Sequence, residues 1–267
     1  EFPTHFERYT RYVVAKLNAQ VKFWIPLNEP TSVIAGSYTT GQWPPQKKNY
    51  FLAHRVYKIL ADAHRRAYHA IHEINPGAQV GLANLLHSFE PYHEHSFLDK
   101  LIIRFSHFFT NEYFLRLTSG THDFLTAQYY FHNRFKFPRK VHLGDKPIND
   151  LGWEIYPKGI YNILKELQQY NLPIYITESG LADAFDDQRL DFIRDHLLWI
   201  HRAIEEGVDV RGYFYWSLLD NFEWDKGFWP RFGLVGVDYD DQERIVRKSA
   251  LFYAQICKDN ALETESI

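Results

Sequence analysis

Five short runs rich in β-branched and aromatic residues alternate with amphipathic stretches along the whole chain. We expect strands at Val21–Leu27, Gln79–Leu85, Phe124–Phe131, Pro173–Glu178 and Val210–Leu218. Apolar residues at helical spacing predict helices at Phe6–Leu17, Phe51–Ile74, Ser96–Leu117, Tyr156–Tyr170, Asp187–Glu206 and Ser249–Asp259. This alternating order is typical of parallel strands joined by crossover helices, so the sequence predicts an α/β fold.

Four connecting segments are longer than ordinary barrel connections and are expected to be loops. They are Pro30–Asn49, Leu86–His95, Asn133–Glu154 and Asp220–Val246. Three of them directly follow the C-terminal end of an expected strand, which is the end where barrel enzymes build their active sites. Long loops there indicate a functional site.

Phosphate-binding motifs and domain boundaries are both missing from the sequence. Neither GxGxxG nor GxxxxGK(S/T) occurs, which disfavours a nucleotide-binding domain. No repeat, low-complexity tract or flexible linker divides the chain. We therefore expect residues 1–267 to form a single domain.

The charge and cysteine content disfavour several classes of partner. The net charge is −3, from 30 basic and 33 acidic residues that are mixed along the chain, so neither nucleic acid nor an anionic membrane is an expected partner. No apolar window reaches the ~18 residues that a membrane-spanning helix needs. Cys257 is the single cysteine and can form no internal disulfide, which leads us to expect a cytoplasmic protein.

The histidines and tryptophans of the chain include further candidate site residues. Two histidine groups, His64, His69 and His72 and then His87, His93 and His95, lack the carboxylate or cysteine support of a metal site, so we predict neither metal nor cofactor. Trp24, Trp153 and Trp199 are expected in the core. Trp216, Trp224 and Trp229 lie among charged residues and are candidates for sugar contact.

Polar and aromatic clusters end four of the expected strands. They are Asn28-Glu29-Pro30, Gln128-Tyr129-Tyr130, Thr177-Glu178-Ser179-Gly180, and Trp216 followed by Glu223-Trp224. Two carboxylates at the ends of parallel strands supply what glycosidic bond cleavage needs, one protonated and one ionised. A separation of about 5–5.5 Å gives retention of configuration and about 6.5–9.5 Å gives inversion, so the sequence leaves the stereochemistry open.

Three runs carry a resemblance to a known family. FWIPLNEP (Phe23–Pro30), YITESG (Tyr175–Gly180) and the run from Gly212 to Asp240 resemble the signatures of glycoside hydrolase family 1, the β-glucosidases and β-galactosidases. GWEIYP (Gly152–Pro157) and RKSALFYAQI (Arg247–Ile256) extend the likeness over almost the entire chain. The resemblance implies a (β/α)₈ TIM barrel, of which this chain covers strands four to eight, with long loops at the C-terminal face.

The resemblance also implies the role of each site residue. Glu29 of the NEP motif would be the acid/base and Glu178 the nucleophile of a retaining β-glycosidase. Tyr130 would hydrogen-bond to Glu178 and keep it ionised, because a donor to the charged form lowers a carboxyl pKa. The remaining sugar contacts would come from the 2-hydroxyl partner Asn28, the aromatic floor Trp216, and the pair that grips the 3-, 4- and 6-hydroxyls, Glu223 and Trp224.

The expected substrate is a small-molecule β-glucoside or β-galactoside without phosphate. A carboxylate at Glu223 would repel the phosphate of a 6-phospho-β-glucoside, although Lys226 lies nearby in sequence. Three departures from the family pattern, Pro26, Gln128 and Ser179, are expected to loosen the contacts around the sugar without removing a catalytic group.

The family places about three β/α units before the acid/base strand, and those units are absent from this sequence. Five parallel strands leave two unpaired edges, which buried-type strands tolerate poorly. A separate N-terminal segment, or one outside the 267 residues of this sequence, is therefore expected to complete the barrel. Three alternatives stay open: a 6-phospho-β-glucosidase, an inverting glycosidase, and an incomplete barrel that binds sugar or acts as a scaffold without turnover.

Overall fold

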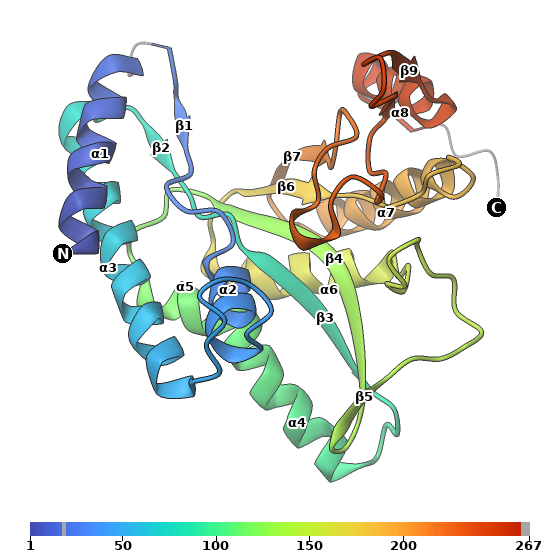
Figure 1. Cartoon of the computed structure of the whole chain (residues 1–267), viewed down its shortest axis with the longest axis horizontal. Helices are drawn as coiled ribbons and strands as arrows, with labels where there is room; N and C mark the ends of the chain where they lie inside the picture. The colour runs from blue at the N-terminus through green and yellow to red at the C-terminus, as the bar shows by residue number, and fades with distance from the viewer. Residues whose placement is uncertain (18–19, 263–267) are drawn as a thin grey trace.

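The computed structural model describes residues 1–17 and 20–262, and its centre is a parallel sheet (Figure 1). β1 (Phe23–Trp24) pairs with β2 (Gln79–Val80), while β3 (Leu85–Pro91), β4 (Leu125–Lys136), β6 (Ile174–Ser179) and β7 (Val210–Tyr215) follow one another as parallel neighbours. A bridge between Asn28 and Ala83 joins the first pair of strands to the rest. All five predicted strands are confirmed, with the second divided into β2 and β3.

The strand that leads to Glu29 is short. β1 ends at Trp24, just before Pro26, and pairing resumes only at Asn28. Proline has no N–H to donate to a ladder, which accounts for the interruption. The chain therefore arrives at Glu29 with fewer ladder hydrogen bonds than the strands that follow.

The predicted helices are confirmed with shifts of a few residues at their ends. The structure contains α1 (Phe2–Leu17), α3 (Tyr50–Ile74), α4 (Phe97–His107), α5 (Tyr113–Leu117), α6 (Lys158–Leu167), α7 (Arg189–Glu205) and α8 (Lys248–Asp259). A π-helical turn, Phe108–Glu112, joins α4 to α5. Asn49 and Ser96 cap α3 and α4 by accepting backbone N–H groups with their side chains.

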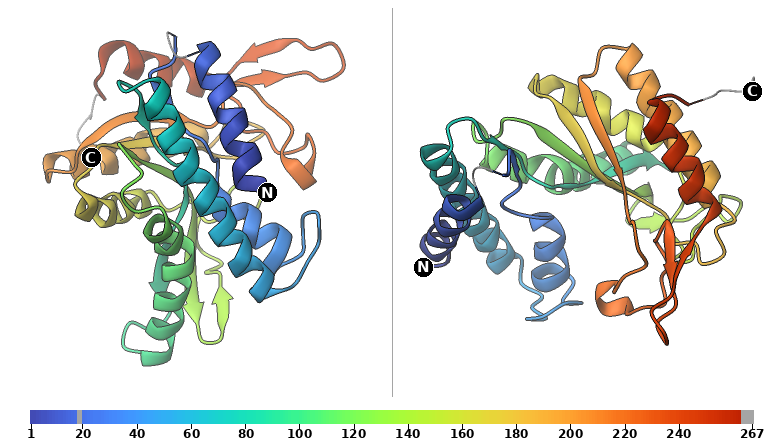
Figure 2. Two further views of the ribbon diagram at one scale, coloured as in Figure 1. Left: turned by 90° about the vertical axis from the view of Figure 1, so that its left-hand side faces the viewer. Right: turned by 90° about the horizontal axis from the view of Figure 1, so that it is seen from above.

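The core lies between the sheet and the helices that cover its outer face (Figure 2). Ile174 and Ile176 of β6 are fully buried in this core, together with Leu164 of α6. Gly159 of α6 permits the close approach of this helix to β4, because a Cβ at that position would lie 1.9 Å from the Tyr129 hydroxyl oxygen. The outer face is thus sealed and fixes the strands from which the site is built.

The four long connections are more ordered than predicted. β3 and β4 extend beyond the rest of the sheet, and β4 turns into an antiparallel hairpin with β5 (Arg139–Val141) (Figure 1). The segment after β1 forms α2 (Pro30–Ile34) and a π-helical turn, Ala35–Thr39. The segment after β7 contains the turn Trp224–Lys226 and a hairpin of β8 (Val235–Val237) with β9 (Arg244–Val246). The prediction that these segments are loops is therefore wrong in part.

The β3–β4 extension was missed because its residues are polar or aromatic. Arg134 is buried and donates to both oxygens of Glu154, and to Glu90 at 3.3 Å. His132, on the same face of β4, contacts the same two carboxylates. Buried charges require such partners. Pairs so far apart in sequence give no periodic signal.

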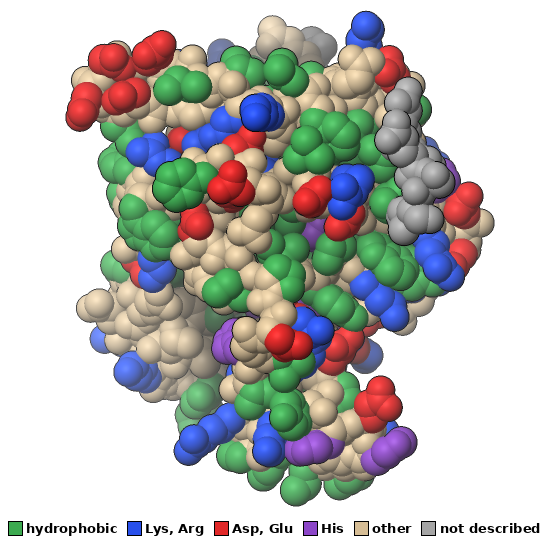
Figure 3. All heavy atoms as spheres, turned by 90° about the vertical axis from the view of Figure 1, so that its right-hand side faces the viewer, with side chains coloured by type: hydrophobic (Ala, Val, Ile, Leu, Met, Phe, Trp, Pro, Cys, Tyr) green, Lys and Arg blue, Asp and Glu red, His purple; other side chains and the backbone are tan. Residues whose placement is uncertain are grey.

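Within the described residues, β1 pairs in the sheet only with β2, and β7 only with β6. Apolar side chains near these edges are open to solvent: Phe23 is 46% exposed and Phe214 is 58% exposed. None of the helices in residues 1–17 and 20–262 combines the length and apolar character needed to cross a membrane. Basic and acidic side chains are interspersed over the face drawn in Figure 3, which shows no continuous basic surface.

Candidate active site

A cavity of about 1100 Å³ opens at the C-terminal ends of the strands. Its wall contains the seven site residues that the family resemblance implies: Asn28, Glu29, Tyr130, Glu178, Trp216, Glu223 and Trp224. Trp229 does not line this cavity, whereas Trp153, which was expected in the core, does. The structure thus brings together seven residues from four strand ends.

Glu178 lies near the end of β6 and is held by donors from β4. The Tyr130 hydroxyl donates to its Oε2 at 2.9 Å, as predicted, and Gln128 Nε2 donates to its Oε1. Gly180 follows closely, and a Cβ there would lie 1.8 Å from the Trp216 carbonyl oxygen. Only glycine therefore allows the chain after Glu178 to pass this close to Trp216.

Glu29 is presented by a turn. Its backbone is left-handed, with φ 44° and ψ 54°, and its N–H donates to Ala83 O at 2.8 Å. Pro30 then begins α2, as suits a residue with a fixed φ and no N–H to satisfy. Ser32, in the first turn of α2, is the side chain that lowers the pKa of Glu29, in opposition to burial.

Burial raises the pKa of both carboxyl groups to about 7. For Glu178 the charge of Glu29 adds to the effect of burial, and the Tyr130 hydrogen bond opposes it. The prediction that Tyr130 keeps the pKa of Glu178 low is thus right about the contact but wrong about the net direction. Two such carboxyls titrate as a pair. With one proton between them, the donors from Tyr130 and Gln128 favour its residence on Glu29.

Glu223 and Trp224 stand on the segment after β7, which is anchored from below. The buried carboxylate of Asp220 accepts from Gly233 N at 2.8 Å and from both Arg247 terminal nitrogens at 3.0 Å. Burial, followed by the charge of Asp225, raises the pKa of Glu223. The anchor leaves Glu223 half-buried in the cavity wall.

A clasp joins the loop after β7 to the loop after β1. Asp225 accepts hydrogen bonds from Gln42 Nε2 at 2.8 Å and from Trp43 Nε1 at 3.2 Å, and the rings of Trp43 and Trp224 are 6.3 Å apart. Figure 2 (right) shows these two segments facing each other across the open side of the sheet. Contacts between the loops after β1 and β7 therefore close the side of the cavity where these two strands do not pair with each other.

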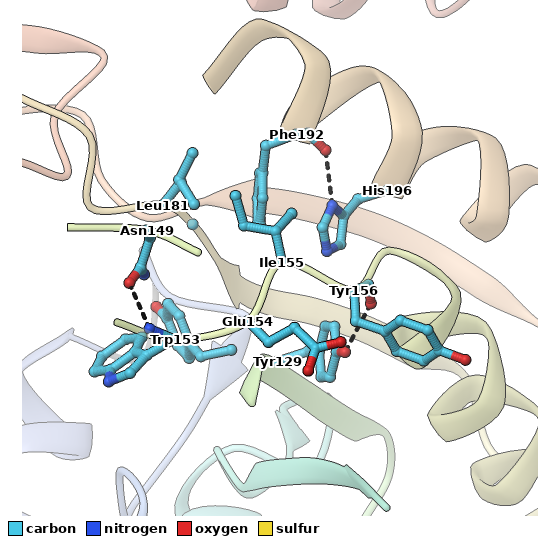
Figure 4. A pocket seen from close by; sticks show the side chains of 11 residues that line it. Tyr129, Asn149, Trp153, Glu154, Ile155, Tyr156, Leu181, Phe192 and His196 are labelled. Carbon is cyan, nitrogen blue, oxygen red and sulfur yellow. Dashed lines mark hydrogen bonds between the residues drawn. The ribbon is translucent and has the colours of Figure 1, made fainter. Parts of the chain in front are cut away.

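Trp153 reaches the cavity wall from the loop behind β4. Asn149 Oδ1 accepts from Trp153 N at 2.9 Å (Figure 4). The indole lies 4.5 Å from the Phe131 ring and 6.1 Å from the Tyr130 ring. Beneath this loop is a small cavity of about 10 Å³, lined in part by Glu154 and His196. That volume is about enough for a single water molecule.

On the side of α3 and α4 the cavity wall is mostly aromatic. Tyr50, Phe51 and His54 at the start of α3 face Phe105 and Phe109 of the α4 segment. Sequence reasoning missed this wall, and also Gln42 and Trp43, because none belongs to a recognised motif. Asp225 lies within the run from Gly212 to Asp240, but the resemblance gave it no role. In the described ranges, no group of three or more His, Cys, Asp or Glu residues could hold a metal ion.

The chain is similar along most of its length to known glycosidases. The profile of Glycosyl hydrolase family 1 matches residues 3–146 and 126–262. β-Glucosidase A of Thermotoga maritima is 35% identical, in an alignment covering 98% of this chain and 69% of that protein. A β-galactosidase of Saccharolobus solfataricus is 33% identical, and this chain spans 60% of its length. The T. maritima β-glucosidase in complex with deoxynojirimycin superposes with a TM-score of 0.93 at 34% identity, covering 98% of this chain and 70% of that one.

Proposed function

Because the chain belongs to glycosyl hydrolase family 1, we propose that it is a retaining β-glycosidase that uses Glu178 as nucleophile and Glu29 as acid/base. Its parallel strands are strands four to eight of the family's (β/α)₈ barrel. The observation that carries the proposal is the unequal support of two carboxyls in one cavity. Glu178 accepts from two sheet side chains, whereas for Glu29 Ser32 is the one side chain that opposes the effect of burial on its pKa.

Two displacements at the anomeric carbon complete the reaction. In the first, a Glu178 oxygen forms a bond to the anomeric carbon while the bond between that carbon and the aglycone oxygen breaks. Glu29 gives its proton to the aglycone oxygen. In the second, Glu29 takes a proton from water, the water oxygen bonds to the anomeric carbon, and Glu178 leaves as a carboxylate. Donors from Tyr130 and Gln128 stabilise the charge that Glu178 carries before and after this cycle.

The substrate we propose is an unphosphorylated β-glucoside or β-galactoside. Asn28 would hold the 2-hydroxyl, Trp216 would stack on the sugar, and Glu223 with Trp224 would bind the remaining hydroxyls. Lys226 Nζ lies 3.0 Å from Asp225, so its charge is paired, and Glu223 would repel a phosphate at the 6-position. The aromatic wall beside α3 suits an apolar aglycone.

We further propose that a segment equivalent to three β/α units completes the barrel. The chain spans 60–70% of the length of the relatives compared above. The edges of β1 and β7 and the exposed Phe23 and Phe214 supply the surface on which such a segment would pair. Its strands would bring further contacts to the same sugar.

Turnover of an aryl β-glucoside tests the proposal, with Glu178→Ala as the control. We expect hydrolysis by the complete protein and an initial β-anomer in the NMR spectrum. An initial α-anomer would instead indicate the inverting mechanism. No turnover, together with equal sugar binding by wild type and Glu178→Ala, would favour the scaffold alternative. Faster hydrolysis of the 6-phospho substrate would overturn the assignment of an unphosphorylated sugar.

The pH profile of kcat/KM gives an independent check. Activity requires ionised Glu178 and protonated Glu29, so a bell-shaped profile is expected. Its alkaline limb should follow the loss of the Glu29 proton, whose pKa is about 7. A profile that stays flat up to pH 9 would exclude Glu29 as the acid.

A further inference from the structure

We propose that Gln128 is a positioning residue that couples the nucleophile to the recognition of the sugar's 2-hydroxyl. Its side-chain amide donates one hydrogen to Glu178 Oε1 and the other to Asn28 Oδ1, the latter at 3.0 Å. One amide thus links the segment after β1 to β6. The inference rests on the proposed function, in which Asn28 contacts the 2-hydroxyl.

The sheet places Gln128 where it can reach both partners. On β4 it is in register with Glu178 of β6 and with Leu85 of β3, and its backbone N–H donates to Asn84 O at 3.1 Å. The residue is only 1% exposed, so water does not compete for its amide hydrogens. The sequence predicts that Gln128 loosens the site, whereas in the structure it makes these two contacts.

The orientation of the amide follows from its partners. Both groups that it faces, the Glu178 carboxylate and Asn28 Oδ1, are acceptors, so a flipped amide would place oxygen against oxygen. Its Oε1 is buried without a hydrogen-bond partner among the described residues. Leaving one acceptor unpaired is costly, and the charge-assisted bond to Glu178 is what compensates it.

The same contact orients Asn28. Because Asn28 Oδ1 accepts from Gln128, its amide nitrogen is the group left to face the cavity, which Asn28 lines. An N–H₂ group presented there can donate to a sugar hydroxyl but cannot accept from one. Gln128 therefore acts on the substrate through Asn28 and on the anomeric carbon through Glu178.

Kinetics on an aryl β-glucoside and its 2-deoxy analogue test the coupling. Gln128→Met keeps the length of the side chain and removes both donors. We expect kcat/KM to fall roughly 10- to 100-fold on the β-glucoside and only a few-fold on the 2-deoxy substrate. The acid limb of the pH profile should move to higher pH, because ionised Glu178 has lost a donor. Gln128→Asn should recover part of the loss.

Thr126→Val is the matched structural control. Thr126 is buried on β4 two residues earlier, and its hydroxyl donates to Leu82 O rather than to Glu178 or Asn28. This variant should reduce the Tm, and any change in kcat/KM should be equal for the β-glucoside and its 2-deoxy analogue. In an Asn28→Ala background, Gln128→Met should lower kcat/KM by the same factor for the β-glucoside and its 2-deoxy analogue.

Equal losses on both substrates, or an unchanged profile, would overturn the role of Gln128. If the wild type turned over neither substrate, the hydrolase proposal would fail, and binding of deoxynojirimycin and its 2-deoxy analogue would then decide this inference. Weaker binding of only the first by Gln128→Met would support it. Equal binding of each inhibitor by both proteins, or no binding at all, would overturn it. Should Gln128→Met fail to fold, Gln128→Asn is measured in the same way.

Discussion

The two carboxyls in the cavity differ in what holds them. Glu178 lies within the sheet, with Ser179 beside it fully buried and with donors from Tyr130 and Gln128 on the neighbouring strand. Glu29 lies on a left-handed turn between an interrupted strand and the short helix α2, where Ser32 lowers its pKa against the effect of burial. One is supported by the regular part of the fold and the other by a connection.

This difference indicates how one fold can give similar groups opposite tasks. Burial raises the pKa of both to about 7, so burial alone does not assign the proton. Hydrogen bonds that stabilise an ionised carboxylate do assign it, and Glu178 accepts them from Tyr130 and Gln128. The nucleophile we propose is thus fixed and charged, whereas the acid/base we propose must change its protonation state twice in each cycle.

Removal of Glu178 should have the largest effect. Glu178→Ala loses the nucleophile, so turnover should fall on the order of 10⁴-fold or more. Added azide should restore product by attacking from the vacated face, and that product should be the α-glycosyl azide. Chromatography against both azide anomers checks this. A β-azide from this variant would show that the two roles are exchanged.

Removal of Glu29 should have a smaller effect that depends on the leaving group. Glu29→Ala should slow hydrolysis of a poor leaving group by roughly 10²- to 10⁴-fold, because protonation is lost. A dinitrophenyl glycoside, which leaves without a proton, should form the glycosyl-enzyme almost normally. Azide should then give the β-glycosyl azide. Equal slowing of all leaving groups would contradict general-acid catalysis by Glu29.

Stability against pH should also separate the two carboxyls. A carboxyl whose pKa rises from 4.5 to about 7 on folding contributes stability that is complete below pH 4.5 and is lost as the pH rises through 7. The glutamine in Glu29→Gln cannot ionise, so the Tm of this variant should match that of the wild type at pH 4.5 and exceed it at pH 8. The gain in unfolding free energy at pH 8 should be about 1–2 kcal/mol.

Glu178→Gln provides the comparison for this effect. Its gain at pH 8 should be smaller, because Tyr130 and Gln128 already offset part of the cost of the Glu178 charge and would face a neutral amide instead. Differential scanning calorimetry at the two pH values measures both variants. A larger gain for Glu178→Gln would mean that the donors do not favour charge on that side.

The strands and helices could be predicted because apolar residues recur in them at regular intervals. Alternating runs such as Pro173–Glu178 keep one face under the covering helices, and the amphipathic stretch before Gly207 has the period of a helix, so the sequence specified both. The extension of β3 and β4 could not be predicted this way. It depends on Arg134, Glu154 and Glu90, whose contacts join residues 20 and 44 positions apart.

The site was predictable to a similar extent. Motifs named the seven predicted residues that line the cavity, and the contact between Tyr130 and Glu178 is confirmed. The direction of the Glu178 pKa was not predictable, because it depends on burial and on the distance to Glu29, which only the folded chain determines. The roles of these residues stay predictions that the variants above would test.

The clasp at Asp225 should give the smallest effect, because it holds the Glu29 side through exposed contacts. Asp225→Ala removes the acceptor for Gln42 and Trp43, so the loops after β1 and β7 should separate. We expect KM for an aryl β-glucoside to rise about 3- to 10-fold with little change in kcat, since exposed contacts contribute on the order of 1 kcal/mol. The control is Asp209→Ala, which breaks an exposed ion pair between Asp209, just before β7, and Arg211 of β7; this variant should leave KM unchanged. An unchanged KM in Asp225→Ala would mean that the acid/base side is held without the clasp, and the contrast between the two carboxyls would then be confined to their immediate donors.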